Sequence, residues 1–341
     1  MSHKVYFTTP IYYANGTAHA GHIYATILGN ILKRHHLQRG HEVKYLTGLD
    51  EHGEAVEQKA KEMKMSPHEL VDSMAQTWKA DFSKFAIDYD IFQRTTSKEH
   101  IKNVQDILNY CYKKGDIYFG DHEGYYCIKC ESYLTESDMT ENKECLIHKI
   151  PTELRKEKNY FFRTTHYKEK VKALILNNQI TTQERYKKEL LGLLENLKGD
   201  LSISRPKSRL TWGVELPFDS EHVTYVWFDA LPNYLTGLGG LEAARESDYW
   251  KNTTHIIGKD ILKFHGIFWQ AICLSLNLPA PKLLITGWIL KDGHKMSKSL
   301  GNVISVEDIL DSGLDAFTNF VYRITPLGED IDFSWETYLE Y

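Results

Sequence analysis

The alternation of hydrophobic and polar positions predicts strands and helices in turn over the first part of the chain. Residues 5–9 are apolar and β-prone, and residues 42–47 fit a second strand. Between them, residues 20–38 carry an apolar stripe at helical spacing, and Gly40 follows as a stop signal. We therefore expect a strand, a helix and a second strand.

Two more helices are expected after the second strand, at residues 53–63 and 66–85. The second begins with Ser66-Pro67-His68-Glu69, which supplies an N-cap, a proline at the first helical position and an acidic side chain at the third. The order strand, helix, strand, helix, strand up to Arg94 predicts an α/β fold, with a doubly wound parallel sheet and helices on both of its faces.

The middle of the chain departs from this alternation. Residues 118–205 hold a cysteine cluster and charged segments that fit hairpins or helices, and we interpret them as an insertion between two halves of the sheet. The alternation is expected to resume with strands at 222–227, 253–258 and 282–287 and a helix at 260–276, followed by short helices at 306–310 and 314–324. The expected units are a first half of the sheet domain at 1–116, the insertion at 117–215, a second half at 216–290, and a loop with short helices at 291–341.

Composition narrows the class of protein. The chain has 341 residues, of which 42% are hydrophobic, enough for a large core and two or three structural units. The formal net charge of -5 argues against broad, non-specific nucleic-acid binding but permits a local basic surface. No stretch is long and apolar enough to cross a membrane, and no secretory signal is expected because the first residues run straight into a strand. We expect a cytoplasmic protein.

A first motif, His19-Ala20-Gly21-His22, stands where a strand and the Asn15-Gly16 loop pass into a helix. The unpaired N–H groups of a helix N-terminus attract phosphate, and two imidazoles beside them can donate to phosphate oxygens that gain charge in a transition state. Gly21 would let a nucleotide approach the backbone. Taken alone, two histidines that cap a helix for structural reasons explain the motif equally well.

A second motif, Lys295-Met296-Ser297-Lys298-Ser299, lies between Gly293 and Gly301 after an apolar strand. Its two lysines can neutralise a departing pyrophosphate, and the flanking glycines favour a mobile loop. A solvated surface loop is the alternative. Basic groups in both motifs, each after a strand, are what an α/β enzyme needs to handle a nucleoside triphosphate, so we favour that function.

Four soft ligands form a third group: Cys127, Cys130, Cys145 and His148. Two close pairs of this kind suit tetrahedral Zn²⁺, and because all four positions are filled by protein we expect one structural zinc per chain. The polar loop at 131–144 could not fold around a core of its own. The other two cysteines, Cys111 and Cys273, lie in apolar helical patterns and are expected to be buried and inert.

These segments together resemble the class I aminoacyl-tRNA synthetases, and within them the methionyl-tRNA synthetases. The resemblance covers essentially the whole chain. It rests on both motifs, on the run from Phe7 to Gly16, and on further segments at Thr47–Gly53, Val226–Leu231, Gly258–His265 and Gly287-Trp288. One mild departure is Ala20, where the family usually has an aliphatic residue; both histidines are kept.

The resemblance implies a Rossmann-like catalytic domain that forms methionyl-adenylate from methionine and ATP with Mg²⁺ and passes the methionyl group to tRNA(Met). It implies a zinc knuckle in the connective insertion and no membrane; we expect no stable protein partner. The implied catalytic residues are His19, His22, Lys295 and Lys298. The implied ATP-binding residues are Asn15, His19, Gly21, His22, Gly258, Asp260, Trp288, Ile289 and Lys298. The implied methionine-binding residues are Ile11, Tyr13, Asp50, Trp227, Ala230, Leu231, Tyr234, Ile261, Phe264 and His265.

This implied set makes physical sense. Asp50 can pair with the substrate ammonium, and aromatic side chains can enclose a polarizable thioether. Tyr234 or His265 could donate weakly to the sulfur, an acceptor that leucine lacks.

The end of the chain leaves one alternative open. Asp332-Phe333-Ser334-Trp335 resembles the start of the helical bundle with which the family reads the anticodon, and the sequence stops at Tyr341. We therefore expect a catalytic portion without that bundle, either truncated or naturally short. The alternative function is a short paralogue that forms adenylate or senses methionine without efficient tRNA charging. A nucleotidyltransferase of the same fold is more remote.

Overall fold

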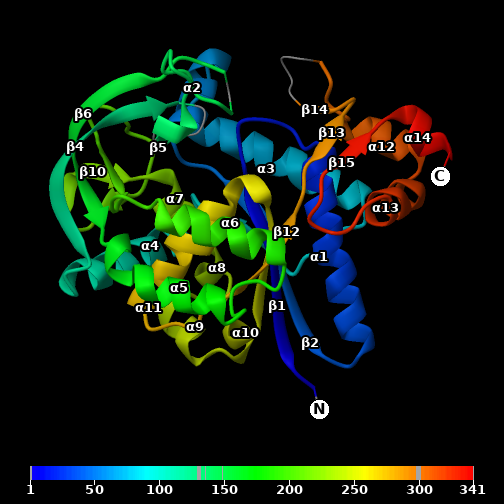
Figure 1. Ribbon diagram of the computed structural model, residues 1–341, viewed down its shortest axis with the longest axis horizontal. Coiled ribbons are helices and arrows are strands. Elements are labelled where there is room, and N and C mark those ends of the chain that lie inside the picture. The colour runs from blue at the N-terminus through cyan, green and yellow to red at the C-terminus, as the bar shows by residue number, and fades with distance from the viewer. Residues whose placement is uncertain (1, 129–131, 135, 148, 297–300, 341) are drawn as a thin grey trace.

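A five-stranded parallel sheet forms the centre of the protein. The computed structural model describes residues 2–128, 132–134, 136–147, 149–296 and 301–340. The strands follow the order β12-β11-β1-β2-β3, all parallel (Figure 1). They are β1 (Lys4–Tyr13), β2 (Glu42–Asp50), β3 (Ile91–Arg94), β11 (Thr253–Gly258) and β12 (Lys282–Thr286). The parallel sheet predicted from the sequence is therefore confirmed, and distant parts of the chain build its two sides.

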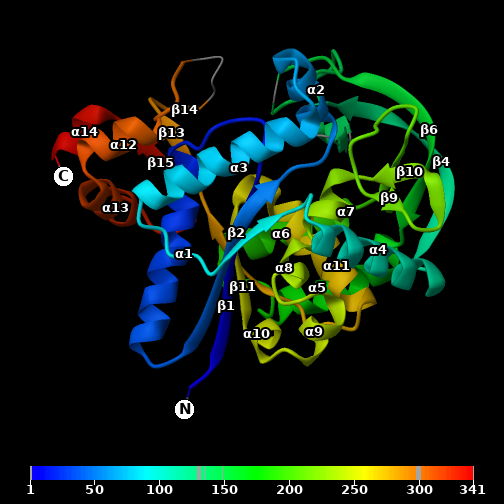
Figure 2. The ribbon, with the colours of Figure 1, turned by 180° about the vertical axis from the view of Figure 1, so that it is seen from behind.

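Successive side chains of the central strands point to opposite faces, so the sheet has two cores. Tyr6 and Leu46 pack with the helices of one face, whereas Phe7 and Tyr45 pack with those of the other. Helices α1 (Ala20–Gln38) and α3 (Pro67–Lys84) lie on the second face, opposite α4 (Lys98–Lys113), α8 (Asn233–Thr236) and α11 (Trp269–Ser275) (Figures 1 and 2). The expected cap of α3 is present, because the Ser66 hydroxyl accepts from the Glu69 N–H and the Glu69 carboxylate accepts from the Ser66 N–H.

The segment predicted as a strand at 222–227 does not join this sheet. Its first part belongs to β10 (Asp219–Thr224), which pairs antiparallel with β8 (Ser204–Pro206) and β9 (Glu215–Leu216) in a separate three-stranded sheet. Val226 then begins α7 (Val226–Ala230). A short turn joins β9 to β10, and such a short connection is possible only between antiparallel strands. The apolar pattern at 222–227 therefore marks an antiparallel strand and not a strand of the parallel sheet. The prediction that the parallel alternation resumes here is wrong.

The insertion is built on an antiparallel sheet of order β5-β4-β6-β7. Its long strands are β4 (Ile117–Cys127) and β6 (Glu153–Phe162); β5 (Ser132–Leu134) and β7 (Leu201–Ser202) are short. Helices α5 (Lys168–Leu176) and α6 (Glu184–Glu195) follow β6. The sheet lies at the outer side of the molecule, away from α1 and α13 (Figure 1). The domain limits expected from the sequence stay predictions.

The helix expected at 260–276 is present but not uniform. A 3₁₀ turn at Lys259–Ile261 and a π turn at Phe264–Phe268 precede α11. Gly266 sits in this wide turn, where a Cβ would come within 2.3 Å of a Leu190 methyl group, so the backbone packs directly against α6. The π turn interrupts the regular α-helical geometry at the point where this segment reaches the cavity described below.

The remaining elements are helices and the three strands of a further small sheet. They are α2 (Glu54–Met63), α9 (Leu241–Glu246), α10 (Asp248–Lys251), β13 (Ile289–Lys291), β14 (His294–Lys295), α12 (Val306–Ser312), α13 (Leu314–Arg323), β15 (Ile331–Phe333) and α14 (Trp335–Glu340). The two short helices predicted near 306 and 314 are thus confirmed as α12 and α13. None of the helices in the described part of the chain is both long and apolar enough to span a membrane.

Candidate active site

A cavity of about 270 Å³ opens at the carboxyl ends of the parallel strands. Its wall takes residues from the ends of β1, β2 and β11, and Thr286 from the end of β12. This edge of an open parallel sheet is where ligands bind in α/β proteins. Pro10 has no N–H for the ladder, and the β1–β2 register shifts between Thr8 and Ile11. The shift sets the course of the last three residues of β1, Ile11–Tyr13, which all line the cavity.

Nine of the ten residues expected to bind methionine lie on the cavity wall. They are Ile11, Tyr13, Asp50, Trp227, Ala230, Leu231, Tyr234, Ile261 and His265. The tenth, Phe264, does not line the cavity but stacks on Trp227, with ring centroids 3.9 Å apart and planes 5° from parallel. Phe264 therefore backs one wall instead of forming its surface.

Most residues expected to bind ATP lie on the same wall. They are His19, Gly21, His22, Gly258, Asp260, Trp288 and Ile289, and Lys295 joins them. Asn15 is not on the wall, and Lys298 lies outside the described residues. The structure brings the first motif and the described part of the second, Lys295 and Met296, to one cavity, although more than 270 residues separate them in sequence.

Seven wall residues had been given no catalytic or binding role in the sequence analysis: Pro10, Tyr12, Ala25, Asn233, Thr286, Gly287 and Met296. Pro10, Tyr12 and Thr286 lie near the carboxyl ends of parallel strands, so the topological rule alone could have indicated them. Asn233 carried no sequence signal. Its buried amide N–H donates to the Ala230 carbonyl at 2.7 Å, while its side-chain oxygen is buried without a partner in the structure.

The two histidines of the first motif cap α1. The His19 Nδ1 accepts from the Gly21 N–H at 3.1 Å, and the His22 Nδ1 accepts from the His19 N–H at 3.3 Å. A neutral imidazole that accepts at Nδ1 carries its proton on Nε2. The cap therefore selects, in both rings, the tautomer whose donor is Nε2–H. The structural and functional interpretations of this motif are compatible.

The second motif contacts the first through its methionine. The Met296 Cε lies 3.9 Å from where a Cβ on Gly21 would stand, and the Met296 sulfur accepts from the Ile304 N–H at 3.4 Å. The Lys295 ammonium lies 4.2 Å from the ring centroid of Trp288, a cation–π contact. The described part of the second motif thus lies on the cavity wall, with Met296 partly buried and Lys295 exposed to solvent.

Tyr234 and His265 bond to each other. The Tyr234 hydroxyl lies 2.8 Å from His265 Nε2, and His265 Nδ1 lies 3.1 Å from the Ile261 carbonyl, to which it must donate. Nε2 is then the acceptor, so the tyrosine proton points at the histidine. Donation to a substrate sulfur by either group would require this bond to be exchanged. Burial lowers the pKa of His265 to about 4 and raises that of Tyr234 far above its ordinary range.

The low pKa of His265 predicts a loss of stability in mild acid. The unfolded chain takes up a proton at this imidazole below pH 6.5, its ordinary pKa, whereas the folded chain resists until about pH 4. The free energy of unfolding should therefore fall as the pH drops through this window, by up to ~1.4 kcal/mol per pH unit for one such group. Urea unfolding at pH 7, 6 and 5 measures it. The slope should be shallower in His265→Gln; an equal slope would show that His265 does not contribute.

The predicted zinc ligands are placed in part. Cys127 ends β4 and Cys145 pairs with Met139 in an isolated bridge, and both side chains are buried. A tight turn follows Cys145, closed by donation from the Lys149 N–H to the Cys145 carbonyl at 2.8 Å. Cys130 and His148 lie outside the described residues; within those described, no group of three or more potential ligands could hold a metal ion.

The cysteines expected to be inert are buried. Cys111 and Cys273 are both fully buried in α4 and α11. Burial raises the pKa of the Cys111 thiol to about 12 and that of Cys273 well above its ordinary range, so both stay protonated thiols.

Comparison with known proteins agrees with this geometry. The family model described as tRNA synthetases class I (M) matches residues 5–141 and 136–341. The methionine–tRNA ligase of Campylobacter jejuni is 39% identical over 334 residues, covering 96% of this chain and 53% of that protein. The methionine–tRNA ligase of Helicobacter pylori strain 26695 is 41% identical over 350 residues, covering 99% and 53%. The chain thus spans about half the length of these curated relatives.

A solved structure shares the fold. The methionyl-tRNA synthetase of Mycobacterium tuberculosis bound by methionyl-adenylate superimposes with a TM-score of 0.92 at 32% identity, over 99% of this chain and 68% of that one. By sequence and by fold, the chain belongs to the class I (M) family of tRNA synthetases.

Proposed function

We propose that this chain holds the catalytic site of a methionine–tRNA ligase. It would activate methionine with ATP to give methionyl-adenylate and pyrophosphate, and then transfer the methionyl group to tRNA(Met). The observation that supports this most is that one cavity gathers a buried carboxylate, an aromatic wall and both basic motifs. The family membership and the adenylate-bound relative agree with it.

Asp50 is the proposed anchor of the amino acid. Its carboxylate lies at the end of β2 and is only 5% exposed, and its backbone carbonyl accepts from the Ala14 N–H at 2.9 Å, which fixes the strand end. A charge-assisted bond to the substrate ammonium is strong in such a sheltered site. Asp50 therefore fixes the amino end of methionine and leaves its carboxylate to attack the α-phosphate of ATP.

The first motif is proposed to stabilise the phosphates. Because His19 and His22 accept at Nδ1 in the helix cap, each ring carries its proton on Nε2, and these Nε2–H groups would donate to phosphate oxygens. Lys295 and Lys298 would neutralise the departing pyrophosphate, and Mg²⁺ would accompany the triphosphate. The site would therefore act by positioning the reactants and stabilising phosphate charge, with no covalent enzyme intermediate.

The side-chain pocket is proposed to select a thioether. Trp227, backed by Phe264, and Tyr13 give aromatic surfaces to a flexible sulfur-containing chain, and each sulfur–aromatic contact is worth roughly 0.3–1.5 kcal/mol. The Tyr234–His265 pair closes this part of the wall. Shape and polarizability together favour methionine over branched aliphatic side chains.

ATP–pyrophosphate exchange tests the proposal. We expect methionine to support exchange and leucine to support it roughly 10–200-fold less well, the range that small differences in apolar shape allow. Equal exchange with the two amino acids would overturn the thioether selectivity. No exchange with methionine would overturn the function itself.

We also propose one structural zinc in the insertion, held by Cys127, Cys130, Cys145 and His148. Supporting this, both described cysteines are buried, Cys127 at the end of β4 and Cys145 at the start of a tight turn, and thiol groups are ligands that suit zinc. When bound, zinc would crosslink the turn to the end of β4.

Elemental analysis of the dialysed protein should therefore give one zinc per chain. Cys130→Ser should lower zinc retention, whereas Cys111→Ser, which changes a thiol in α4, should not. Chelator-free protein without zinc would contradict the site.

A further inference from the structure

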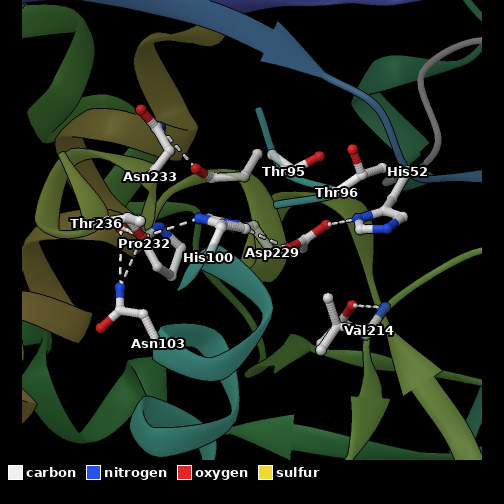
Figure 3. Close-up of polar contacts among 12 residues, drawn as sticks. His52, Thr95, Thr96, His100, Asn103, Val214, Asp229, Pro232, Asn233 and Thr236 are labelled. Atoms are coloured by element: carbon white, nitrogen blue, oxygen red, sulfur yellow. Dashed lines mark hydrogen bonds and ion pairs between the residues drawn. The ribbon is translucent and has the colours of Figure 1, made fainter. Parts of the chain in front are cut away.

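Three buried side chains outside the cavity wall form a continuous polar network behind it. The His52 Nδ1–H donates to Asp229 Oδ2 at 2.6 Å, and the His100 Nε2–H donates to Asp229 Oδ1 at 3.0 Å (Figure 3). Asp229 and His100 have no exposed surface and His52 has 5%. Both carboxylate oxygens of Asp229 are thereby satisfied. We call this set the Asp229 brace.

The brace holds a negative charge inside the protein. Burial alone would raise the pKa of Asp229, but the two histidines outweigh it and hold this pKa at about 2, so the carboxylate stays ionised at neutral pH. Replacing a buried charged group and its partners by apolar side chains is often neutral or stabilising. Stability alone therefore does not explain why the fold buries this group, and its contacts indicate what else it could do.

The brace connects three segments that each carry residues of the cavity wall. His52 follows Asp50 by two residues at the end of β2, and Asp229 itself lies in α7 between the wall residues Trp227 and Ala230. On its other side, the His100 Nδ1 lies 2.9 Å from the Thr236 hydroxyl at the end of α8, which carries the wall residue Tyr234. The brace thus joins the strand that carries the proposed ammonium anchor to both short helices of the aromatic wall.

Further bonds hold the outer end of the network. The Asn103 amide donates to the Thr236 hydroxyl at 2.9 Å (Figure 3). The Asn103 side-chain oxygen accepts from the Leu241 N–H at 3.0 Å. On the inner side, the residue between Asp50 and His52 is also tied, because the Glu51 carboxylate accepts from Arg94 at 2.6 Å. The residues just after β2 are therefore tied both to the brace, through His52, and to β3, through Arg94.

We propose that the Asp229 brace sets the distance between Asp50 and the aromatic wall, so that His100, which touches neither substrate, is a positioning residue for methionine. The proposal rests on the proposed function. The proposal gives a role to His52 and Asp229, which lie in segments that resemble the family but to which the sequence analysis assigned no function. It also gives a role to His100, which lies in none of these segments.

A matched pair of variants at His100 tests it. His100→Gln keeps an amide donor near the Nε2 position, whereas His100→Phe keeps ring volume and removes both polar contacts. We expect His100→Phe to raise the KM for methionine roughly tenfold or more, because it removes one hydrogen bond to a charged group. The KM for ATP should stay within about twofold of its original value. His100→Gln should recover most of the loss.

Hydrogen–deuterium exchange of the ligand-free chain supplies a readout that does not need the enzyme activity. In His100→Phe, amides at 48–53 and 226–236 should exchange faster, while those of α13 should be unchanged. Should His100→Phe fail to fold, Thr236→Val removes the hydroxyl that contacts His100, Asn103 and the Pro232 carbonyl, and it leaves both bonds to the Asp229 carboxylate in place. It should shift the same amides and the methionine KM in the same direction.

The outcomes distinguish a failure of the Asp229 brace proposal from a failure of the proposed function. Equal rises of both KM values, or no rescue by glutamine, would show a merely structural role and overturn the proposal, as would unchanged exchange at 48–53. If the unaltered chain shows no methionine-dependent activity, the proposed function fails, and the exchange pattern still decides whether His100 orders the wall.

Discussion

Asp50→Asn is expected to lower kcat/KM for methionine in ATP–pyrophosphate exchange by about 10²–10³-fold. Asparagine has the shape of aspartate but no charge, so the substrate ammonium would enter a sheltered cavity without its counter-ion. Truncating one partner of a buried, hydrogen-bonded charge pair costs roughly 2–5 kcal/mol. The KM for ATP should change little, because the proposed phosphate contacts come from the two motifs.

Asp106→Asn is the matched control, since Asp106 is an exposed carboxylate on α4 paired with Lys102. It should leave all exchange parameters unchanged. A fall of less than about threefold for Asp50→Asn, or an equal fall for the control, would mean that the ammonium is recognised by another group.

His19→Asn should lower the rate of adenylate formation by roughly 10²–10³-fold and leave the stability of the protein nearly unchanged. Asparagine is a strong N-cap residue, so its side-chain oxygen can replace Nδ1 as acceptor of the Gly21 N–H. It has no donor where the Nε2–H of histidine would meet a phosphate. Loss of one such donor to a developing charge costs about 10²–10³ in rate.

His19→Ala separates the two roles of this imidazole. Its rate should be as low as that of His19→Asn, but it should also lose about 1 kcal/mol in urea unfolding, because the cap is gone. Single-turnover adenylate formation gives the rates. If the asparagine variant kept the full rate, His19 would be a helix cap alone.

The sequence predicted those features of the fold and site that depend on local chemistry. The cap of α3 and the periodicity of α1 follow from short-range patterns, and the structure places them as expected. The strand expected at 42–47 is also present, but it runs on to Asp50. The segment around His222 shows the limit. β-prone residues suit any pleated surface, so their pattern does not reveal which strand they pair with.

Contacts between residues far apart in the sequence could not be predicted either. Asn233, His100 and the Tyr234–His265 bond depend on which helices meet behind the sheet, and nothing in their neighbouring residues indicates it. Nine of the ten residues that the resemblance implied for methionine line the cavity, but the resemblance did not indicate that Phe264 stacks behind Trp227.

Identification of the bound product tests the central claim most directly. The chain would be incubated with Mg²⁺, ATP and an equimolar mixture of the twenty amino acids, separated quickly from free ligands, and its bound adenylate identified by mass spectrometry. The account predicts methionyl-adenylate as the dominant species in the unaltered chain and its loss in Asp50→Asn. A different aminoacyl-adenylate, or none in the unaltered chain, would contradict it.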